Sequence, residues 1–405
     1  MKTRPPFSSL MRLLLLTAAL GLLRPQSAAA SCALDSTFNA GGYANGQVHA
    51  ILVEPSPSFK VLMGGSFTVI NGTTRTYFAR LNADGTVDPG VSVVLNGPVY
   101  AIAREPGGLL WLGGAFTTVN GANSPYLVRL KLNFQIASFF SPDGPVYALA
   151  IQPDGKILVG GNFNYVNGVG SRGFVRINNS NNAIEPVYNY PYGPVYSISV
   201  NTIPGSPNYG KIYVGGEFEQ LAGPLTRKRV MRYNSSLYAD TTFDAGSDVN
   251  GTVYAVNCVP WNNFNNQDEE RIMIGGDFSY GGSVRLAQLY PDGQINFNVN
   301  LQYDNTVKVI AVQPSILPAE RKLLIGGCFT TANSYSRGGL VRLLMNQSMQ
   351  APVDTDWNPC QGATGCSPTC IQAASYQGSR IIAGGCFGYY DNVFRPYFAG
   401  LHRDP

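Results

Sequence analysis

The sequence predicts an all-β protein with the fold of a seven-bladed β-propeller, whose four-stranded antiparallel blades form a ring closed by the N-terminal strand. Three observations carry this prediction. A glycine pair followed two positions later by phenylalanine occurs seven times, each copy lies between strand-like segments, and a strand missing at the C-terminus is found at the N-terminus. The composition agrees, because 46 glycines, 27 prolines and only 13% charged residues are typical of short strands joined by turns.

The glycine motif recurs at intervals of 47 to 60 residues, a period typical of propeller blades. We expect the first glycine to let backbones approach closely, the second to permit a positive φ as the strand ends, and the phenylalanine to enter the core between blades. A phosphate-binding loop would require a following helix, and no helical pattern follows any copy, so the motif is interpreted as structural. Its members are Gly64, Gly65 and Phe67; Gly113, Gly114 and Phe116; Gly160, Gly161 and Phe163; Gly215, Gly216 and Phe218; Gly275, Gly276 and Phe278; Gly326, Gly327 and Phe329; and Gly384, Gly385 and Phe387.

Each motif is preceded by an inner strand and followed by a third strand and an outer fourth strand. The last copy lacks its outer strand, whereas "CALDSTFNAG" (32–41) matches the outer-strand segment "LYADTTFDAG" (237–246). We therefore expect residues 33–39 to complete the last blade, which would remove open sheet edges. The blades are predicted at 47–92, 98–141, 145–190, 194–246, 252–302, 306–357 and 368–402.

Residues 1–30 are predicted to be a secretory signal peptide, which leaves residues 31–405 as one propeller domain. Basic residues precede the apolar run 13–23, and "SAAAS" (27–31) offers a cleavage site after Ala30. No other segment approaches the length of a membrane span. The first 30 residues hold four basic residues and no acid, so 24 basic and 24 acidic side chains remain, a balance that gives no electrostatic argument for nucleic-acid binding.

The segment "YALAIQPDGKILVGGNFNYVNGVGSRGFVRIN" (147–178) resembles the delta-60 repeat of secreted bacterial propellers and, more distantly, kelch repeats, which also carry a glycine pair. The resemblance covers essentially all of the chain after residue 30. It implies a β-propeller and an extracellular setting, and it implies little about activity, because the delta-60 group is largely without assigned function. The tryptophan of kelch repeats is not in register here, so kelch partner binding is not carried over.

One position of the inner strand is mostly tyrosine, which is expected to pack between blades with its hydroxyl near the channel. The exceptions His49, Lys308 and Cys370 belong to blades 1, 6 and 7, which neighbour one another, and they form a candidate site. The full set is His49, Tyr100, Tyr147, Tyr196, Tyr254, Lys308 and Cys370.

Arginine recurs at two positions. One set, in the third strand, is expected to bind loop carbonyls or an outer-strand aspartate, with an anion-binding ring as the alternative; it comprises Arg80, Arg129, Arg176, Arg232 and Arg342, with Gln288 and Gly400 in the remaining copies. The other set lies between strands two and three, is expected to face solvent, and is a candidate for ligand binding: Arg75, Arg172, Arg227, Arg285, Arg337 and Arg395.

Five cysteines are expected around blades 6 and 7, where an oxidising compartment favours disulfides: Cys328, Cys360, Cys366, Cys370 and Cys386. No short C-x-x-C pair is present, so a zinc site is not predicted. Cys32 is expected to be unpaired, with lipidation of Cys32 as a minor alternative. Acceptors for N-glycosylation, if the host glycosylates, are Asn71, Asn178, Asn234, Asn250 and Asn346.

No catalytic motif is present: the two histidines cannot build a three-histidine metal site, and H-E-x-x-H, G-x-S-x-G, P-loop and calcium-loop patterns are all missing. We therefore expect a secreted, monomeric binding or interaction module for an extracellular protein or glycan, without metal or cofactor. The alternative is an extracellular hydrolase or lyase with its active site at the channel mouth. The insertions 201–211 and 261–271 provide a second candidate contact surface.

Overall fold

The computed structural model describes residues 34–39, 42–220, 227–262, 268–280, 283–299, 301–313, 320–345, 353–357, 359, 362–366 and 369–403. Strands, turns and loops make up these residues, and no α-helix occurs among them, so the all-β prediction is confirmed. The predicted signal peptide 1–30 and Cys32 lie outside the described residues. In the part of the chain that is described, no helix could cross a lipid bilayer.

Seven sheets share one plan, in which the strand that ends in the glycine pair lies between the first and third strands of its repeat. All neighbouring strands in them are antiparallel. The sheets consist of β1 (Val48–Val53), β2 (Val61–Gly65) and β5 (Phe78–Leu81); β6 (Val99–Arg104), β7 (Leu110–Gly114), β10 (Leu127–Leu130) and β11 (Ile136–Phe140); β12 (Val146–Ile151), β13 (Ile157–Gly161), β16 (Phe174–Ile177) and β17 (Ile184–Glu185); β18 (Val195–Val200), β19 (Ile212–Gln220) and β20 (Arg227–Tyr233); β21 (Thr252–Asn262), β22 (Asp268–Tyr280) and β23 (Ser283–Leu289); β24 (Val307–Gln313), β25 (Lys322–Gly327) and β28 (Leu340–Leu344); and β30 (Cys370–Gln377), β31 (Arg380–Cys386) and β34 (Phe398–His402).

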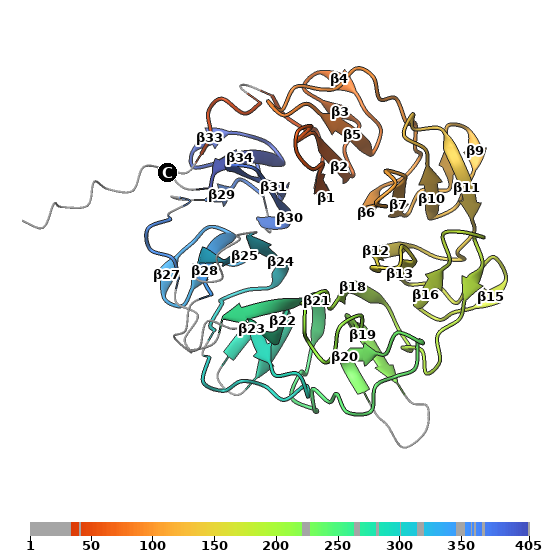
Figure 1. Ribbon diagram of the computed structural model, residues 1–405. Helices are drawn as coiled ribbons and strands as arrows, with labels where there is room; N and C mark the ends of the chain where they lie inside the picture. Colours follow the sequence, from red (N-terminus) through yellow and green to blue (C-terminus); the bar gives the residue numbers. More distant parts are fainter. Residues whose placement is uncertain are drawn as a thin grey trace, which may run out of the picture.

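The sheets follow one another around a ring in chain order, with the first strand of each nearest the middle (Figure 1). Each first strand contacts the first strand of the next sheet, and β30 of the last sheet contacts β1 of the first. Short hairpins such as β3 (Val69–Ile70) with β4 (Thr73–Thr74) lie between the second and third strands. Isolated bridges such as Leu95 with Val119 connect these hairpins to the segments that enter each sheet, so hairpins and entering segments occupy the same end of the ring.

The fourth strand is shorter than the sequence predicts. Only β11 and β17 are outer strands of these sheets in the described residues, whereas elsewhere the fourth position is a single bridged pair, as between Leu81 and Val87. The reason is visible at Asp88, whose Oδ1 accepts a hydrogen bond from the Gly90 amide at 2.8 Å. This local turn directs the chain away from the sheet after one pair.

The first glycine of each pair allows one repeat to pack closely on the next. A Cβ at Gly160 would lie 2.7 Å from Val195 Cγ1 of the following sheet, and a Cβ at Gly384 would lie 2.6 Å from Val48 Cγ1 of the first sheet. The expected reason for the second glycine is wrong, because none of the seven pairs has a positive φ. A Cβ at Gly161 would instead overlap the carbonyl oxygen of Pro145 in the neighbouring strand. Both glycines therefore serve close approach, which a side chain would prevent.

Third-strand arginines such as Arg232 and Arg176 connect their repeat to the following one. Arg232 Nε donates to Asp240 Oδ2 at 2.9 Å, and its Nη1 donates to the carbonyl of Pro291 in the following repeat. Arg176 does the same with Glu185 at 2.7 Å and with the Ser235 carbonyl at 2.6 Å. We call such an arginine with its carboxylate and its carbonyl an arginine clamp. Clamps satisfy several guanidinium donors at once, which is the role expected for this set from the sequence.

The N-terminal residues lie against the C-terminal strand β34. Leu34 forms a bridge with Leu401, and the amide of Asp35 donates to the carbonyl of Gly400 at 2.9 Å. Glycine is needed there because a Cβ at Gly400 would lie 2.6 Å from the Phe38 ring. The Asp35 carboxylate, only 1% exposed, accepts a hydrogen bond from the side chain of Arg380. This segment thus stands where other repeats have their fourth strand.

We expect Gly160→Ala to lower the free energy of unfolding by about 1–3 kcal/mol, because the added Cβ meets the stiff Val195 side chain at 2.7 Å. Chemical denaturation measures this change. A Cβ at Gly107 would meet no atom within 4 Å, and Gly107 has no positive φ, so Gly107→Ala should change stability by less than about 0.5 kcal/mol. A double-mutant cycle with Val195→Ala should recover at least part of the loss; strict additivity would contradict the contact.

We expect Asp35→Asn to lower the melting temperature at pH 7 and to have little effect near pH 2. Burial alone raises the pKa of Asp35, but hydrogen bonds from Thr37 and Arg380 outweigh it and lower the pKa from 3.8 to about 2. The carboxylate therefore stabilises the fold above about pH 4, and this contribution is lost as the pH falls towards 2. Thermal melts at several pH values check this, with exposed Asp248→Asn as the control; a difference that persists unchanged at pH 2 would disprove the linkage.

Candidate functional site

Each first strand contains a β-bulge at its second or third residue, and the bulge turns one side chain towards the middle of the ring. The strand registers skip one residue there, as between Val48 and Ala50, which leaves His49 without a cross-strand partner. Bulges re-aim side chains in this way and often occur beside functional sites. We call the seven half-buried residues at these positions the bulge ring: His49, Tyr100, Tyr147, Tyr196, Tyr254, Lys308 and Gln372.

The members of the bulge ring contact one another in sequence around the middle. His49 and the four tyrosines form a continuous series of ring contacts that ends at Tyr254. The centroids of neighbouring rings in this series are separated by 5.2 to 5.5 Å. Lys308 Nζ lies 3.0 Å from the centroid of the Tyr254 ring, a cation–π contact. At the other end His49 Nδ1 lies 2.5 Å from Gln372 Oε1. The result is a curved, largely aromatic surface with a cation near one end.

The seventh member of the bulge ring is Gln372, not Cys370 as the sequence alignment predicts. The register shift of β30 falls between Ile371 and Ala373. Cys370 lies two residues before Gln372, and in the strand register it stands opposite Cys386. The position before each bulge holds a branched residue that packs on the first glycine of the preceding repeat, and Ile371 packs on Gly326 in this way. The atypical segment "PTCIQAA" hides this because it contains neither the valine nor the tyrosine of the other copies.

A second set of side chains lies beside the bulge ring, at the variable position between the glycine pair and the phenylalanine. The backbone fixes this position, because its amide donates to the carbonyl two residues before the bulge, as Ser66 does to Gln47 at 2.8 Å. Ser66 Oγ then lies 2.8 Å from His49 Nε2. We call these residues the variable set: Ser66, Ala115, Asn162, Glu217, Asp277, Cys328 and Cys386.

Burial sets the charges of the bulge ring. It lowers the pKa of Lys308 from 10.5 to about 8, an effect that the carboxylate of Asp277 opposes. It lowers the pKa of His49 below 6.5, against a hydrogen bond with Gln372. It raises the pKa of the four tyrosines, that of Tyr196 to about 12 with a further contribution from Glu217. At neutral pH the ring therefore presents a neutral imidazole, neutral phenols and an amine that is mostly protonated.

The arginines between strands two and three do not gather into one site. The expectation that they face solvent is wrong for Arg337 and Arg395, each 8% exposed, because their guanidinium groups fold back onto the preceding carbonyl. The other members also engage this chain: Arg75 donates to the Thr74 carbonyl, Arg227 pairs with Asp244 at 3.0 Å, Arg285 pairs with Asp277, and Arg172 lies 4.8 Å from the Tyr192 ring centroid. Arg285 reaches the neighbourhood of the bulge ring through Asp277.

Cys328 and Cys370 form a disulfide, so the prediction of disulfides near the last two sheets is confirmed for this pair. Cys366 and Cys386 are free thiols; burial raises the pKa of Cys366 to about 12, and a hydrogen bond with Cys386 adds to the shift. Cys360 lies outside the described residues. In the described parts of the chain, no three histidine, cysteine or carboxylate side chains are grouped to hold a metal ion.

Several predicted glycosylation acceptors use their side chains within the protein. The Asn71 amide donates to Asn39 Oδ1 and to the Gly85 carbonyl, and the Asn178 amide donates to Glu185 at 3.2 Å. Asn250 donates to Ser279 Oγ at 3.1 Å, and Asn234 Oδ1 accepts from the Ser236 amide. Asn346 lies outside the described residues.

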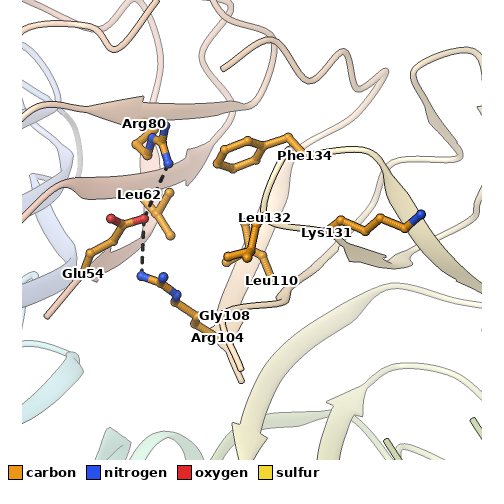
Figure 2. Close-up of a pocket in the computed structure, with 9 residues that line it drawn as sticks. All are labelled: Glu54, Leu62, Arg80, Arg104, Gly108, Leu110, Lys131, Leu132 and Phe134. Carbon is orange, nitrogen blue, oxygen red and sulfur yellow. Dashed lines mark ion pairs between the residues drawn. The ribbon is translucent and has the colours of Figure 1, made fainter. Parts of the chain in front are cut away.

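A separate pocket of about 90 Å³ lies between the first two sheets, at the opposite ends of the strands that carry the bulges (Figure 2). Glu54 directly follows β1. Its carboxylate forms ion pairs with Arg104 at 3.4 Å and with Arg80 at 3.7 Å. Phe134 and Leu132 close the other side (Figure 2). The pocket has room for only a few waters and its carboxylate is paired with two arginines, so it is a poorer ligand site than the bulge ring.

Sequence reasoning missed Ser66 and Gln372. A signal for the first was present, because the residue inside the glycine motif differs in nearly every copy while its neighbours do not. A residue that varies inside an otherwise constant structural motif is free of the packing that fixes the others. For Gln372 the sequence held no comparable signal, since its repeat departs from the common pattern.

Five stretches of the chain match the family model described as "Domain of unknown function (DUF5122) beta-propeller": residues 60–90, 110–133, 152–181, 210–243 and 321–348. Each stretch contains the second and third strands of one repeat. The chain therefore carries β-propeller repeats. Among curated proteins no match was found.

Solved structures resemble the chain at low sequence identity. The extracellular domain of a hybrid two-component system of B. thetaiotaomicron aligns with a TM-score of 0.50 and 14% identity, over 91% of this chain and 39% of that chain. Virginiamycin B lyase from Staphylococcus aureus aligns with a TM-score of 0.48 and 13% identity, over 89% and 97% of the two chains. The computationally designed Ika8 protein aligns with a TM-score of 0.47 and 10% identity, over 93% and 100%. At these identities the similarity concerns the fold alone.

We expect removal of the Cys328–Cys370 disulfide to lower the free energy of unfolding by about 2–4 kcal/mol, because the bond closes a loop whose ends are 42 residues apart. Denaturation of the protein with and without reductant measures the loss. The double variant Cys328→Ala, Cys370→Ala already lacks the disulfide, so reductant should not lower its free energy of unfolding by this amount again. Equal stability of the oxidised and reduced proteins would contradict the expectation.

Proposed function

We propose that the protein is a secreted binding module whose ligand site is the bulge ring together with the variable set. The observation that supports this most is the convergence of unlike, half-exposed side chains on one place, each held by a strand. A binding site needs such rigid support for its contacting groups. Glycan and protein ligands both fit the proposal, and the chemistry of the ring favours a glycan.

The bulge ring offers apolar ring faces and polar edges side by side. Its tyrosines are neutral hydroxyl donors, since burial raises their pKa, and their rings supply apolar area. Glu217 and Asp277 add acceptors next to Tyr196 and Tyr254. A saccharide has matching apolar C–H faces and hydroxyl edges. An acidic group on the saccharide would suit Lys308, which makes no ion pair among the described residues.

We further propose that the repeats form a seven-bladed propeller whose ring is closed by the N-terminal segment. The bridge of Leu34 with Leu401, the contact of Gly384 with Val48 and the Asp35–Arg380 pair support this closure. The Asp35→Asn melts described above test it. The same proposal includes export by residues 1–30, a monomeric state and action without a cofactor. It also includes no binding of nucleic acid. Mass spectrometry of the exported chain and light scattering measure the first two.

A hydrolase or lyase active at the same end of the ring is the second candidate function. A specific observation favours it: Ser66, His49 and Gln372 are linked by hydrogen bonds. A binding module and an enzyme would differ in turnover, which a ligand-binding assay does not measure.

We expect the protein to bind one or more acidic oligosaccharides on a glycan array, and Tyr147→Leu to weaken that binding at least tenfold by calorimetry, because a central aromatic contact is lost. Lys308→Gln should weaken binding of the acidic ligand more than that of its neutral analogue. Wild-type affinity for the acidic ligand should also fall as the pH rises through about 8, where Lys308 loses its proton.

Tyr209 is exposed in the first insertion, away from the bulge ring, so Tyr209→Leu is the matched control and should bind like wild type. If Tyr209→Leu weakens binding and Tyr147→Leu does not, the insertion 201–211 is the binding surface and the proposed site is wrong. No binding on glycan arrays and in pull-downs with extracellular proteins would reject the binding function as a whole.

A further inference from the structure

Ser66, His49 and Gln372 form a chain of hydrogen bonds whose proton positions follow from their chemistry. Gln372 Nε2 faces Gln47 Oε1 at 3.4 Å, which leaves Gln372 Oε1 towards His49 Nδ1 at 2.5 Å. A glutamine oxygen only accepts, so Nδ1 of His49 carries the proton. Nε2 then has a free lone pair and accepts from the Ser66 hydroxyl at 2.8 Å. The imidazole is thus in the tautomer that removes a proton from serine.

His49 is also in the protonation state that a base requires. Burial lowers its pKa below 6.5, against the hydrogen bond with Gln372, so the ring is neutral at pH 7. Its aromatic neighbour Tyr100 is neutral as well, because burial raises the pKa of that phenol. A neutral imidazole hydrogen-bonded to a hydroxyl is the arrangement that activates serine as a nucleophile.

The three residues are held by the frame of the repeats. The Ser66 amide donates to the Gln47 carbonyl at 2.8 Å, and the adjacent Phe67 is fully buried, so the backbone on both sides of Ser66 is fixed. His49 and Gln372 both stand at bulges, in the first and last sheets. The Ser66 side chain itself is exposed, so a reagent can reach its hydroxyl.

We infer that Ser66 is a nucleophilic hydroxyl for carboxylic-ester substrates, with His49 as its general base and Gln372 as the residue that positions His49. In the reaction, Ser66 Oγ forms a bond to the acyl carbon while its proton passes to His49 Nε2. The alcohol leaves with that proton as its C–O bond breaks. Water, deprotonated by the same nitrogen, then releases the acid and restores Ser66. The reaction needs no oxidant, metal or further co-reactant.

The inference rests on the second candidate function, the hydrolase, and stands apart from the ligand-binding function, because a serine can be activated whether or not a saccharide binds the tyrosines. It also distinguishes one repeat from the others. Asn162 occupies the same backbone position beside Tyr147, where no imidazole is available, and Ala115 does so beside Tyr100. Only the first repeat combines a hydroxyl in the variable set with a base in the bulge ring.

A fluorophosphonate reagent tests the inference on the full secreted chain. Ser66 Oγ should displace fluoride and form a bond to phosphorus, and the adduct should map to Ser66 by peptide mass spectrometry. Ser66→Ala should abolish the adduct, and His49→Gln should slow its formation about 100-fold, within the usual contribution of a general base. With p-nitrophenyl acetate the same variants should lose the release of p-nitrophenol.

Gln372 is tested by a pair of variants with opposite expectations. Gln372→Leu should slow labelling at least tenfold, because Nδ1 loses its acceptor, whereas Gln372→Glu keeps an acceptor and should restore the rate. A purely structural role would not be rescued in this way. Melting curves of all variants establish that they are folded.

The matched control places a serine at the same backbone position without a base. Asn162→Ser in the Ser66→Ala background should remain unlabelled. Labelling of wild type that is no faster than that of His49→Gln, an adduct on any other residue, or equal labelling of the Asn162→Ser control would overturn the inference. The glycan-binding measurements are unaffected by any of these outcomes, so the two proposals can fail separately.

Discussion

The structure depends on a packing constraint between neighbouring repeats: each glycine pair leaves no room for a side chain. The first glycine meets a branched residue of the next sheet, as Gly160 meets Val195, and the second meets a carbonyl of its own sheet, as Gly161 meets that of Pro145. With both contacts in place, the first strand bulges at the following residue. The same contact that joins two sheets therefore turns one side chain per repeat towards the middle.

The arginine clamps act on the outer part of the same frame. Arg232 holds Asp240 of its own repeat and the Pro291 carbonyl of the next, and Asp240 is in turn held by the Thr242 amide. Neighbouring repeats are thus joined by close glycine contacts near the middle of the ring and by arginine hydrogen bonds farther out. Apart from Cys328, which forms the disulfide with Cys370, the residues of the bulge ring and the variable set make neither of these contacts, so unlike residues such as Ser66 and Asp277 can occupy one backbone position.

Much of this architecture was predictable from sequence, and the failures have physical causes. The all-β class and the repeats followed from the glycine motif, because the motif encodes a backbone contact that any copy must satisfy. The role of the second glycine was misjudged, since a sequence does not distinguish a positive φ from a close carbonyl. Gln372 was missed because Ile371 replaces the valine that marks the bulge elsewhere, and the Ser66–His49 pair was missed because it depends on a hydrogen bond across strands.

The variable set has a consequence for protein engineering. Its backbone is fixed by an amide-to-carbonyl hydrogen bond, as from Glu217 to Pro194, and this bond does not involve the side chain. The natural chain already carries serine, alanine, asparagine, glutamate, aspartate and cysteine at this position. The frame therefore behaves as a scaffold with one variable position per repeat, and a combinatorial library at these positions, with Cys328 kept for its disulfide, would sample new specificities without changing the backbone hydrogen bonds that hold them.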